Sequence, residues 1–217
     1  MSFRYYLYVS DAKVDMLLSQ IAPGWARKRV TEVNFDLKMV GAKRTVEAAG
    51  ADRFARLERV MQHLEDHGDL GDVDGVDEPG QYVHGVLPMQ WGAIGDGGTV
   101  YFGGRGERTI VGLGGSTAHV VSTQPAEGLS QHRLSGSVMP MMLDQLAALA
   151  AGDTVTTDVD DALATVIRAN SALRGPAQRV EFVAKRMLYG PCPYPELYPG
   201  QDMAVLLGSP LFVALAE

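Results

Sequence analysis

The segment from residue 81 to residue 122 most constrains the fold, because it contains four short strand-like runs in quick succession. The runs are QYVHGVLPM, TVYFGG, RTIVGLG and TAHVVS, and Gly or Asp clusters separate them. Each run is rich in β-branched and aromatic residues, and short Gly-rich connections are typical of antiparallel neighbours. The segment therefore predicts a meander of consecutive strands.

Two further segments alternate between apolar and polar residues, which is the pattern of a strand with one buried and one exposed face. They are FRYYLYVS, residues 3–10, and TEVNFDLKMVG, residues 31–41. In the first segment, Leu7 and Val9 lie on the face expected to be buried, and Tyr8 lies on the opposite face. Strands with two unlike faces are typical of antiparallel or mixed sheets.

Five segments carry apolar residues at helical spacing. The last of them, GPAQRVEFVAKRMLYG, has Pro176 in its first turn and ends at Gly190, and both residues are typical of helix boundaries. Together the elements predict a single α+β domain over residues 1–217, a mostly antiparallel or mixed β-sheet with about five helices packed on it. The predicted helices cover residues 11–21, 51–68, 137–152, 158–173 and 175–190.

The charge and the cysteine content narrow the range of functions. The chain of 217 residues carries 19 Lys and Arg against 26 Asp and Glu, and this formal net charge of -7 disfavours binding to nucleic acid. Its single cysteine excludes an internal disulfide and a cysteine-rich zinc site. Neither a signal-peptide pattern nor an apolar run of membrane-spanning length occurs. We therefore expect a cytoplasmic protein that binds no membrane, nucleic acid or cofactor.

Two segments share the outline of an apolar run, a Gly-Ser pair and a second apolar run. They are VGLGGSTAHVV, which contains Ser116, and VLLGSPLFVAL, which contains Ser209. A phosphate-binding loop needs its glycines to lead into a helix, but the residues that follow each pair favour a strand. We therefore expect a tight turn or a glycine bulge at each pair. Neither a P-loop nor a dinucleotide fingerprint is present in the sequence.

Two histidines lie within strand-like runs and are candidates for a site. If hairpins bring His84 and His119 onto neighbouring strands, they could act as general bases or as metal ligands; otherwise they are partly buried residues bonded to nearby polar groups. Trp91 and Tyr101 belong to the same meander, and amphipathic aromatic side chains favour ligand contact. The candidate ligand-binding residues are therefore His84, Trp91, Tyr101, His119 and Ser116.

Two patterns that resemble metal sites are better explained without a metal. His63 and His67 have the spacing of helical metal ligands, but they lie near a helix end, where the dipole favours positive histidine. The acidic loop GDLGDVDGVDEPG places Leu70 and Gln81 where an EF-hand requires its first and last ligands. We expect a solvated surface loop and no bound metal. Cys192 lies between two prolines with no histidine nearby in sequence, and we expect it to be inert.

Four blocks of the chain resemble blocks of an uncharacterised actinobacterial family, a domain of unknown function. The blocks are YYLYVSDAKVDMLLSQI, VGLGGSTAHVV, RVEFVAKRML and LLGSPLFVAL, and together they span most of the chain. The resemblance implies a cytoplasmic protein of a GC-rich bacterium. It implies no activity, cofactor or catalytic residue.

The order YVHG and then TVYFGG also resembles the His-then-Tyr order of ADP-ribosyltransferase active sites, in which a later Glu orients the ribose. That resemblance implies His84 and Tyr101 as site residues, with Glu107 or Glu181 as the acid. The sequence otherwise contains no recognisable nucleophile–base pair, metal cluster or phosphate loop. We therefore expect a binding or regulatory module for a small molecule or a protein partner, and a homo-oligomer stays open. The alternative is an enzyme with a strand-borne site around His84, Tyr101 and His119.

Overall fold

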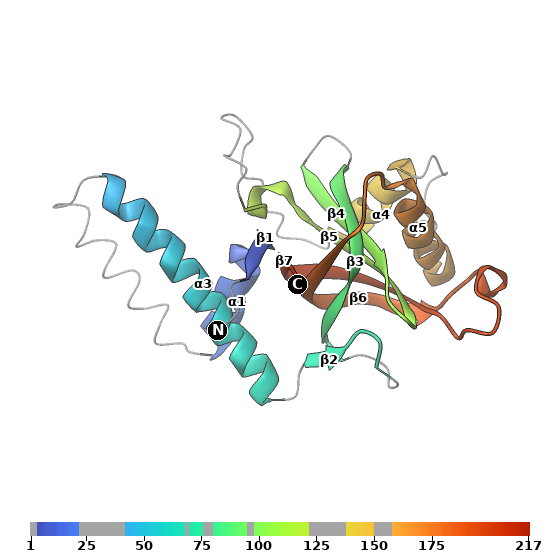
Figure 1. Cartoon of the computed structure of the whole chain (residues 1–217), viewed down its shortest axis with the longest axis horizontal. Coiled ribbons are helices and arrows are strands. Elements are labelled where there is room, and N and C mark those ends of the chain that lie inside the picture. Colours follow the sequence, from blue (N-terminus) through green and yellow to red (C-terminus); the bar gives the residue numbers. More distant parts are fainter. Residues whose placement is uncertain are drawn as a thin grey trace. The chain divides into compact units, whose positions relative to one another are not determined.

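The chain folds into two compact units, which are described separately (Figure 1). The helical unit covers residues 10–70, and the barrel unit combines residues 1–9 with 71–217. Whether the whole chain behaves as one domain stays a prediction. The structure is a computed structural model that describes residues 4–21, 42–67, 70–75, 80–94, 98–121, 138–149 and 158–217.

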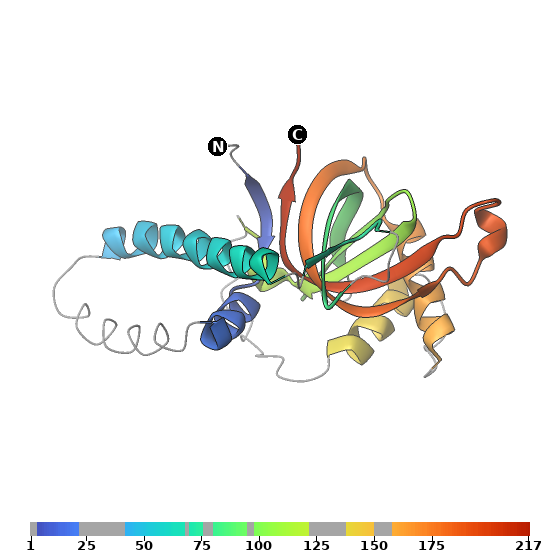
Figure 2. The ribbon, with the colours of Figure 1, turned by 90° about the horizontal axis from the view of Figure 1, so that it is seen from below.

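Five strands of the barrel unit close into a β-barrel. They are β3 (Tyr82–Ile94), β4 (Thr99–Arg105), β5 (Thr109–Ser116), β6 (Gln178–Pro191) and β7 (Ala204–Leu215). The first three form an antiparallel meander, β5 pairs in parallel with β7, and β6 pairs antiparallel with both β7 and β3. Each of the five strands therefore has neighbours on both sides, which removes the unpaired edge of an open sheet (Figure 2).

Side chains fill the interior of the barrel. Alternate residues of the five strands belong to one apolar cluster, in which Phe102, Leu113 and Phe182 are at most 1% exposed. Even a barrel of about eight strands is only just wide enough for side chains, so a smaller barrel leaves no room for a ligand inside. Any ligand of this unit therefore has to bind outside the barrel.

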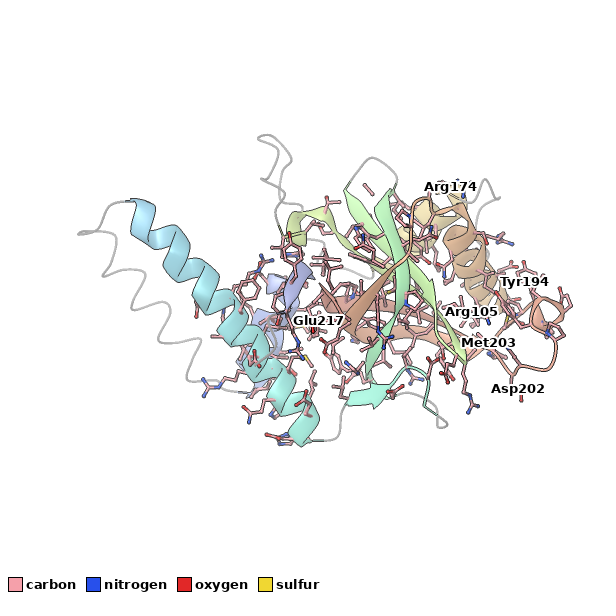
Figure 3. All side chains as sticks on the ribbon, in the orientation of Figure 1. Arg105, Arg174, Tyr194, Asp202, Met203 and Glu217 are labelled. Atoms are coloured by element: carbon pink, nitrogen blue, oxygen red, sulfur yellow. The ribbon has the colours of Figure 1, made fainter. Side chains whose placement is uncertain are left out.

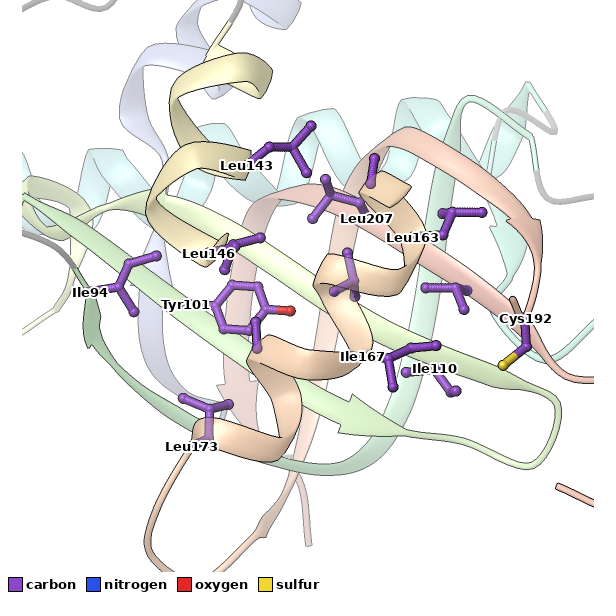
Figure 4. Packing of buried hydrophobic residues seen from close by; sticks show 14 of the residues in the cluster. Ile94, Tyr101, Ile110, Leu143, Leu146, Leu163, Ile167, Leu173, Cys192 and Leu207 are labelled. Carbon is purple, nitrogen blue, oxygen red and sulfur yellow. The ribbon is translucent and has the colours of Figure 1, made fainter. Parts of the chain in front are cut away.

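Two helices cover one outer side of the barrel. α4 (Val138–Leu149) and α5 (Val159–Ala172) pack on side chains that point outward from the strands, among them Tyr101 (Figure 4). Asp158 caps α5, because its side chain accepts the backbone N–H of Asp160 at 3.2 Å. The barrel unit thus has two apolar layers, one inside the barrel and one between the barrel and these helices.

Two further strands join the same sheet. β1 (Tyr5–Val9) pairs antiparallel with the end of β7, and β2 (Leu70–Asp72) lies beside β3. Tyr8, which the sequence places on the face opposite Leu7 and Val9, is 1% exposed. The register of β1 shifts between Tyr6 and Tyr8, and this irregularity interrupts the simple alternation of faces.

The helical unit consists of α1 (Asp11–Ile21) and α3 (Ala42–Asp66), which pack against each other. Arg56 is only 6% exposed. A buried guanidinium requires carboxylate partners, because an isolated charge is costly to remove from water. The carboxylates that contact it belong to Asp11, Asp15 and Asp52. Within the described ranges, no helix combines the length and the apolar character needed to cross a bilayer.

The expected fold class is wrong in two respects. The strands close into a barrel instead of an open sheet, and the described residues contain four α-helices instead of about five. The fifth predicted helix, residues 175–190, is mostly strand β6. Its residues Val180, Phe182 and Ala184 follow a period of two and point into the barrel. Gly190 lies inside the strand, so it ends no helix.

The meander prediction is confirmed for β3, β4 and β5 and is wrong for its last run. Residues Thr117–His119 form a short 3-10 helix instead of a strand. No turn follows the second Gly-Ser pair, because Gly208 lies inside β7, beside a shift in its register with β6. The predicted strand at residues 31–41 lies outside the described residues.

Gly115 is required for close packing and not for unusual backbone geometry. Among the described glycines only Gly175 and Gly200 have a positive φ. A Cβ atom at Gly115 would lie 2.5 Å from the hydroxyl oxygen of Tyr8 and 2.7 Å from its Cζ. Gly115 therefore leaves the space that the buried Tyr8 ring occupies.

The acidic loop after β2 contains a structural carboxylate. Asp74 accepts backbone N–H bonds from Glu107, Arg108 and Thr109, each at 3.0 Å. Glu107 and Arg108 lie in the turn between β4 and β5, and Thr109 is the first residue of β5. The exposed Asp72 and Gly75 fit the predicted surface loop, and the half-buried Asp74 in addition fixes this turn.

Candidate functional site

The first candidate site is a cleft of about 340 Å³ between α5 and the barrel, called the α5 cleft below. Strands β3, β4 and β5, helix α5 and the loop after β6 all contribute to its walls. Parts of the chain that are far apart in sequence therefore meet there. The wall residues that matter below are Gln90, Arg105, Ile110, Ile167, Asn170 and Tyr198.

Asn170 fixes α5 against the barrel at the base of this cleft. A Cβ atom at Gly103 would lie 2.9 Å from Asn170 Cγ, so the glycine lets the helix approach the strand. Tyr101 donates its hydroxyl to Asn170 Oδ1 at 2.7 Å. Asn170 Nδ2 donates to the carbonyl oxygens of Gly104 and Val111 at 3.3 and 3.0 Å. Since both ends of the amide are engaged, Asn170 positions the wall of the cleft.

Tyr101 lies beneath α5 and is completely buried. This burial raises the pKa of Tyr101 above its ordinary value. Its hydroxyl therefore keeps its proton and acts as a hydrogen-bond donor. A tyrosine in this state cannot serve as a general base at neutral pH.

Arg105 is the only charged side chain among the described residues that line the α5 cleft. Arg105 is the last residue of β4 (Figure 3). Its Cζ lies 5.0 Å from the centroid of the Tyr198 ring, and its Nη2 donates to Gln201 Oε1 at 3.4 Å. Stacking on an aromatic ring orients a guanidinium but leaves its charge in place. The cleft therefore offers a positive, planar group beside an aromatic wall.

The loop between β6 and β7, residues 192–203, contributes to a second cleft. The backbone N–H of Cys192 donates to the carbonyl of Met203 at 2.8 Å, and Arg168 Nη1 donates to the Tyr194 hydroxyl at 3.2 Å. The second cleft, called the loop cleft below, has a volume of about 580 Å³. Asp202 is the only ionised side chain among its described lining residues. The two clefts thus carry opposite charges.

A polar cluster on the outer face of β3 and β6 contains His84. Its Nε2 lies 3.3 Å from Glu181 Oε1, and Arg4 donates to both carboxylate oxygens of Glu181 at 3.0 Å. Partial burial opposes the charge on Arg4, but the carboxylate of Glu181 and the hydroxyl of Tyr6 outweigh it and raise the pKa of Arg4. Neither cleft is lined by a residue of this cluster.

His84 and Tyr101, which the enzyme alternative combines, lie far apart. Tyr101 pairs with Gly92 of β3, and His84 precedes Gly92 by eight residues, or about 26 Å along a strand. The structure instead brings His84 to Glu181, one of the two acids that the ADP-ribosyltransferase resemblance implies. Glu107 lies in the turn between β4 and β5, where its backbone N–H bonds Asp74.

The other three predicted residues have contacts that explain their positions without a ligand. The ring of Trp91 lies 6.0 Å from that of Phe102, and the ring of His119 lies 6.0 Å from that of Tyr8. The Ser116 side chain accepts a hydrogen bond from the 3-10 helix that follows it. None of the five predicted residues lines the α5 cleft or the loop cleft.

The comparison with protein families covers nearly the whole chain. The model of a family of unknown function, DUF7019, matches residues 4–217 and so includes both units. The chain belongs to DUF7019. The DUF7019 match confirms the resemblance to a family of unknown function. Searches of the curated proteins and of the solved structures find no match.

Sequence patterns missed the residues that form the α5 cleft of this DUF7019 chain. One signal for Asn170 was present, because Leu163, Val166, Ile167 and Asn170 share helical spacing. An amide on an otherwise apolar stripe indicates a buried polar partner. Arg105 gave no such signal, since it lies between glycines in a segment that resembles an ordinary turn.

His63 on α3 and His67, which follows the end of that helix, show no arrangement for a metal. The rings of His63 and His67 lie 3.9 Å apart between centroids, and His67 Nδ1 lies 2.9 Å from the carbonyl oxygen of His63. Across the part of the DUF7019 chain that the structure describes, no group of three or more His, Cys, Asp or Glu side chains is placed to hold a metal. The expectation that no metal is bound stays a prediction.

Proposed function

We propose that the protein is a binding module that takes a small organic anion in the α5 cleft. The observation that carries the proposal is Arg105, the one charged side chain in the described lining. A cleft with a single cation and no carboxylate favours an anionic ligand through charge complementarity. Its guanidinium is already oriented by the Tyr198 ring, 5.0 Å away, which lowers the entropic cost of engaging a ligand.

The walls of the cleft support a ligand with an apolar body. Ile110, Ile167 and Tyr198 line it, and Gln90 and Ser171 add polar atoms. Ligand sites in proteins commonly measure about 300–1,000 Å³, and the cleft lies near the lower limit with about 340 Å³. An aromatic carboxylate or a comparably small anion matches both the size and the chemistry.

The polar groups near the α5 cleft favour binding over catalysis, because they are already hydrogen-bonded within the protein. The Tyr101 hydroxyl and the Asn170 amide are committed to each other and to the backbone. The contact between His84 and Glu181 supports the enzyme alternative, because a carboxylate can orient a histidine base. Since neither residue lines the α5 cleft or the loop cleft, a substrate of such an enzyme would bind on the outer face of β3 and β6.

The composition and charge of the chain support proposals about the location, partners and source of the protein. We infer a cytoplasmic location, which the single free thiol of Cys192 supports, because stable disulfides are the usual device of oxidising compartments. The net charge of -7 supports the absence of a nucleic-acid partner. The frequent use of Ala, Gly, Val and Arg supports an actinobacterial source. Assembly into a homo-oligomer stays open.

Calorimetric titration with aromatic carboxylates and their uncharged amides tests the proposed function. Benzoate should bind, and benzamide, which has the same shape without the charge, should bind about tenfold more weakly or not at all. Arg105→Gln should remove most of this difference. Arg179→Gln is the matched control, because Arg179 is exposed on β6 and does not line the cleft.

Two further variants separate binding from the enzyme alternative. His84→Gln and Glu181→Gln should leave carboxylate binding unchanged, because both residues lie outside the cleft. The proposal is wrong if no carboxylate in the series distinguishes the wild type from Arg105→Gln while both proteins remain folded. A loss of carboxylate binding in His84→Gln would instead move the site to the outer face of β3 and β6.

A further inference from the structure

The β6–β7 loop, residues 192–203, carries the aromatic wall of the α5 cleft and is stiff along most of its length. Its three prolines fix their own φ angles and restrict the residues before them. The backbone N–H of Tyr198 donates to the carbonyl of Pro195 at 3.0 Å, and that of Gln201 donates to the carbonyl of Tyr198 at 3.1 Å. The position of the Tyr198 ring therefore follows the position of the loop as a whole.

Both ends of the loop are anchored in the apolar layer between the barrel and the helices. Cys192 and Met203 are 8% and 6% exposed there, and the backbone N–H of Cys192 donates to the carbonyl of Met203 at 2.8 Å. The rings of Tyr194 and Tyr198 pack against the same cluster but are only half-buried. Packing therefore fixes the ends of the loop, and the orientation of its middle depends on polar contacts as well.

Two arginines from different elements hold the middle of the loop. Arg105, at the end of β4, contacts the Tyr198 ring and the Gln201 side chain. Arg168 of α5 donates from Nη1 to the hydroxyl of Tyr194 at 3.2 Å (Figure 3). The loop is thus attached to both sides of the α5 cleft, to the barrel through Arg105 and to the helix through Arg168.

Arg168 is exposed on α5, but a buried partner holds its guanidinium. Its Nη2 donates to Thr165 Oγ1 at 3.0 Å, and the Thr165 hydroxyl donates in turn to the carbonyl of Asp161 at 2.8 Å. Thr165 is completely buried. A planar guanidinium that bonds two acceptors has a defined direction. Arg168 therefore transmits the position of the helix backbone to Tyr194.

We infer that Arg168 and Tyr194 are positioning residues for the anion site of the α5 cleft, because they hold the loop so that the Tyr198 ring stays against Arg105. Neither residue lines the α5 cleft or the loop cleft, so their effect on a ligand passes through the loop. The inference rests on the proposed function, since it needs an anion that binds at Arg105. A ligand that meets an ordered loop binds without the cost of ordering it.

Tyr194→Phe tests the inference, because it removes the hydroxyl that accepts from Arg168 and keeps the packed ring. The dissociation constant of benzoate, measured by calorimetric titration, should rise about three- to tenfold, the equivalent of one ordinary hydrogen bond. Arg168→Gln should give a similar rise. The double variant should bind no more weakly than the weaker single variant, because both changes break the same bond.

Tyr189→Phe is the matched control. Tyr189 is a half-buried tyrosine of β6 that does not line the α5 cleft, and within the described ranges its hydroxyl has no hydrogen bond. This variant should bind benzoate as the wild type does.

Hydrogen exchange separates positioning from general damage to the fold. Without ligand, the amides of Tyr198 and Gln201 should exchange about three- to tenfold faster in Tyr194→Phe than in the wild type. Benzoate should slow these amides more in the variant than in the wild type, since only the variant has to order its loop on binding. The amides that pair β4 with β5 should exchange equally in both proteins.

The outcomes distinguish this inference from the proposed function. If Arg105→Gln loses benzoate while Tyr194→Phe binds it as tightly as the wild type, the anion site is retained and the positioning role is wrong. Equal loop exchange in Tyr194→Phe and the wild type, or additive losses in the double variant, would also overturn the positioning role. If the wild type binds no benzoate, the proposed anion site is wrong and this inference is wrong with it.

Discussion

The Tyr101 hydroxyl donates a 2.7 Å hydrogen bond to Asn170 Oδ1 and so joins the barrel to helix α5. We expect Tyr101→Phe to lower the free energy of unfolding by about 1–3 kcal/mol, because it leaves the Asn170 oxygen without its donor. Urea unfolding measures the change. Tyr5→Phe is the control, since Tyr5 is 65% exposed and should tolerate the loss of its hydroxyl. Equal losses in both variants would contradict this role of the bond.

The same tyrosine should make stability depend on alkaline pH. Burial raises the pKa of Tyr101 in the folded protein, while in the unfolded chain the pKa stays near 10. Below that pH the hydroxyl is protonated in both states, and the full stability is present. Above it only the unfolded chain loses the proton, so the free energy of unfolding should fall by about 1.4 kcal/mol per pH unit.

Denaturant titrations across this alkaline range test the prediction by comparing variants. In Tyr101→Phe the free energy of unfolding should fall by about 1.4 kcal/mol less per pH unit than in the wild type. In Tyr5→Phe it should fall as steeply as in the wild type. Other tyrosines and lysines titrate in the same range, and the comparison cancels their contribution. Identical slopes in all three proteins would show that Tyr101 ionises as freely in the folded state as in the unfolded state.

Gly115→Ala should destabilise the barrel, although alanine is permitted by the backbone at that position. The added Cβ would collide with the buried ring of Tyr8, and overpacking of this kind typically costs about 1–3 kcal/mol. Gly92→Ala is a matched control in β3, since no atom lies within 4 Å of the Cβ position there. Thermal melts should show a lower Tm for the first variant only. Equal Tm values for the two variants would mean that the Tyr8 ring moves aside with no loss of stability.

Asp74→Ala should loosen the turn between β4 and β5. Three backbone N–H groups would lose their shared carboxylate, and hydrogen bonds to charged groups contribute about 1.5–3 kcal/mol. Hydrogen exchange should therefore accelerate at the amides of Glu107, Arg108 and Thr109. Asp144→Ala, on the exposed face of α4, should leave these amides unchanged. Unchanged protection in Asp74→Ala would mean that the turn holds its shape without the carboxylate.

Local patterns predicted the elements better than their assembly. The helices near residues 11–21 and 158–173 and the strands of the meander follow from spacing and caps that act within one segment. β6 was mistaken for a helix, because over this short segment its charged and apolar residues fit the helical period of 3.6 residues as well as the strand period of two. Closure of the barrel depends on the pairing of Thr109 with Ala204, which no local signal encodes.

The candidate clefts were harder to predict for a related reason. Ligand-binding residues were sought among histidines and aromatics inside the strands, and each of those has a structural partner. The clefts instead combine Arg105 from a strand end with Tyr198 and Asp202 from a distant loop. Only the barrel, with its filled interior, places these segments together. Asn170 was the one member that its spacing on a helix could have revealed.

β7 pairs with three strands, β1, β5 and β6, so the barrel cannot close until this last strand has been synthesised. Until Ala204–Leu215 has been synthesised, β5 lacks its parallel neighbour and β6 lacks one of its partners. The meander of β3, β4 and β5 is therefore complete about a hundred residues before the barrel can close, and during that interval it exposes an unpaired, apolar edge. Contacts so distant in sequence slow folding, and exposed edges favour aggregation. Slower synthesis at low temperature, or a chaperone that shields β5 on the ribosome, should therefore raise the yield of folded protein.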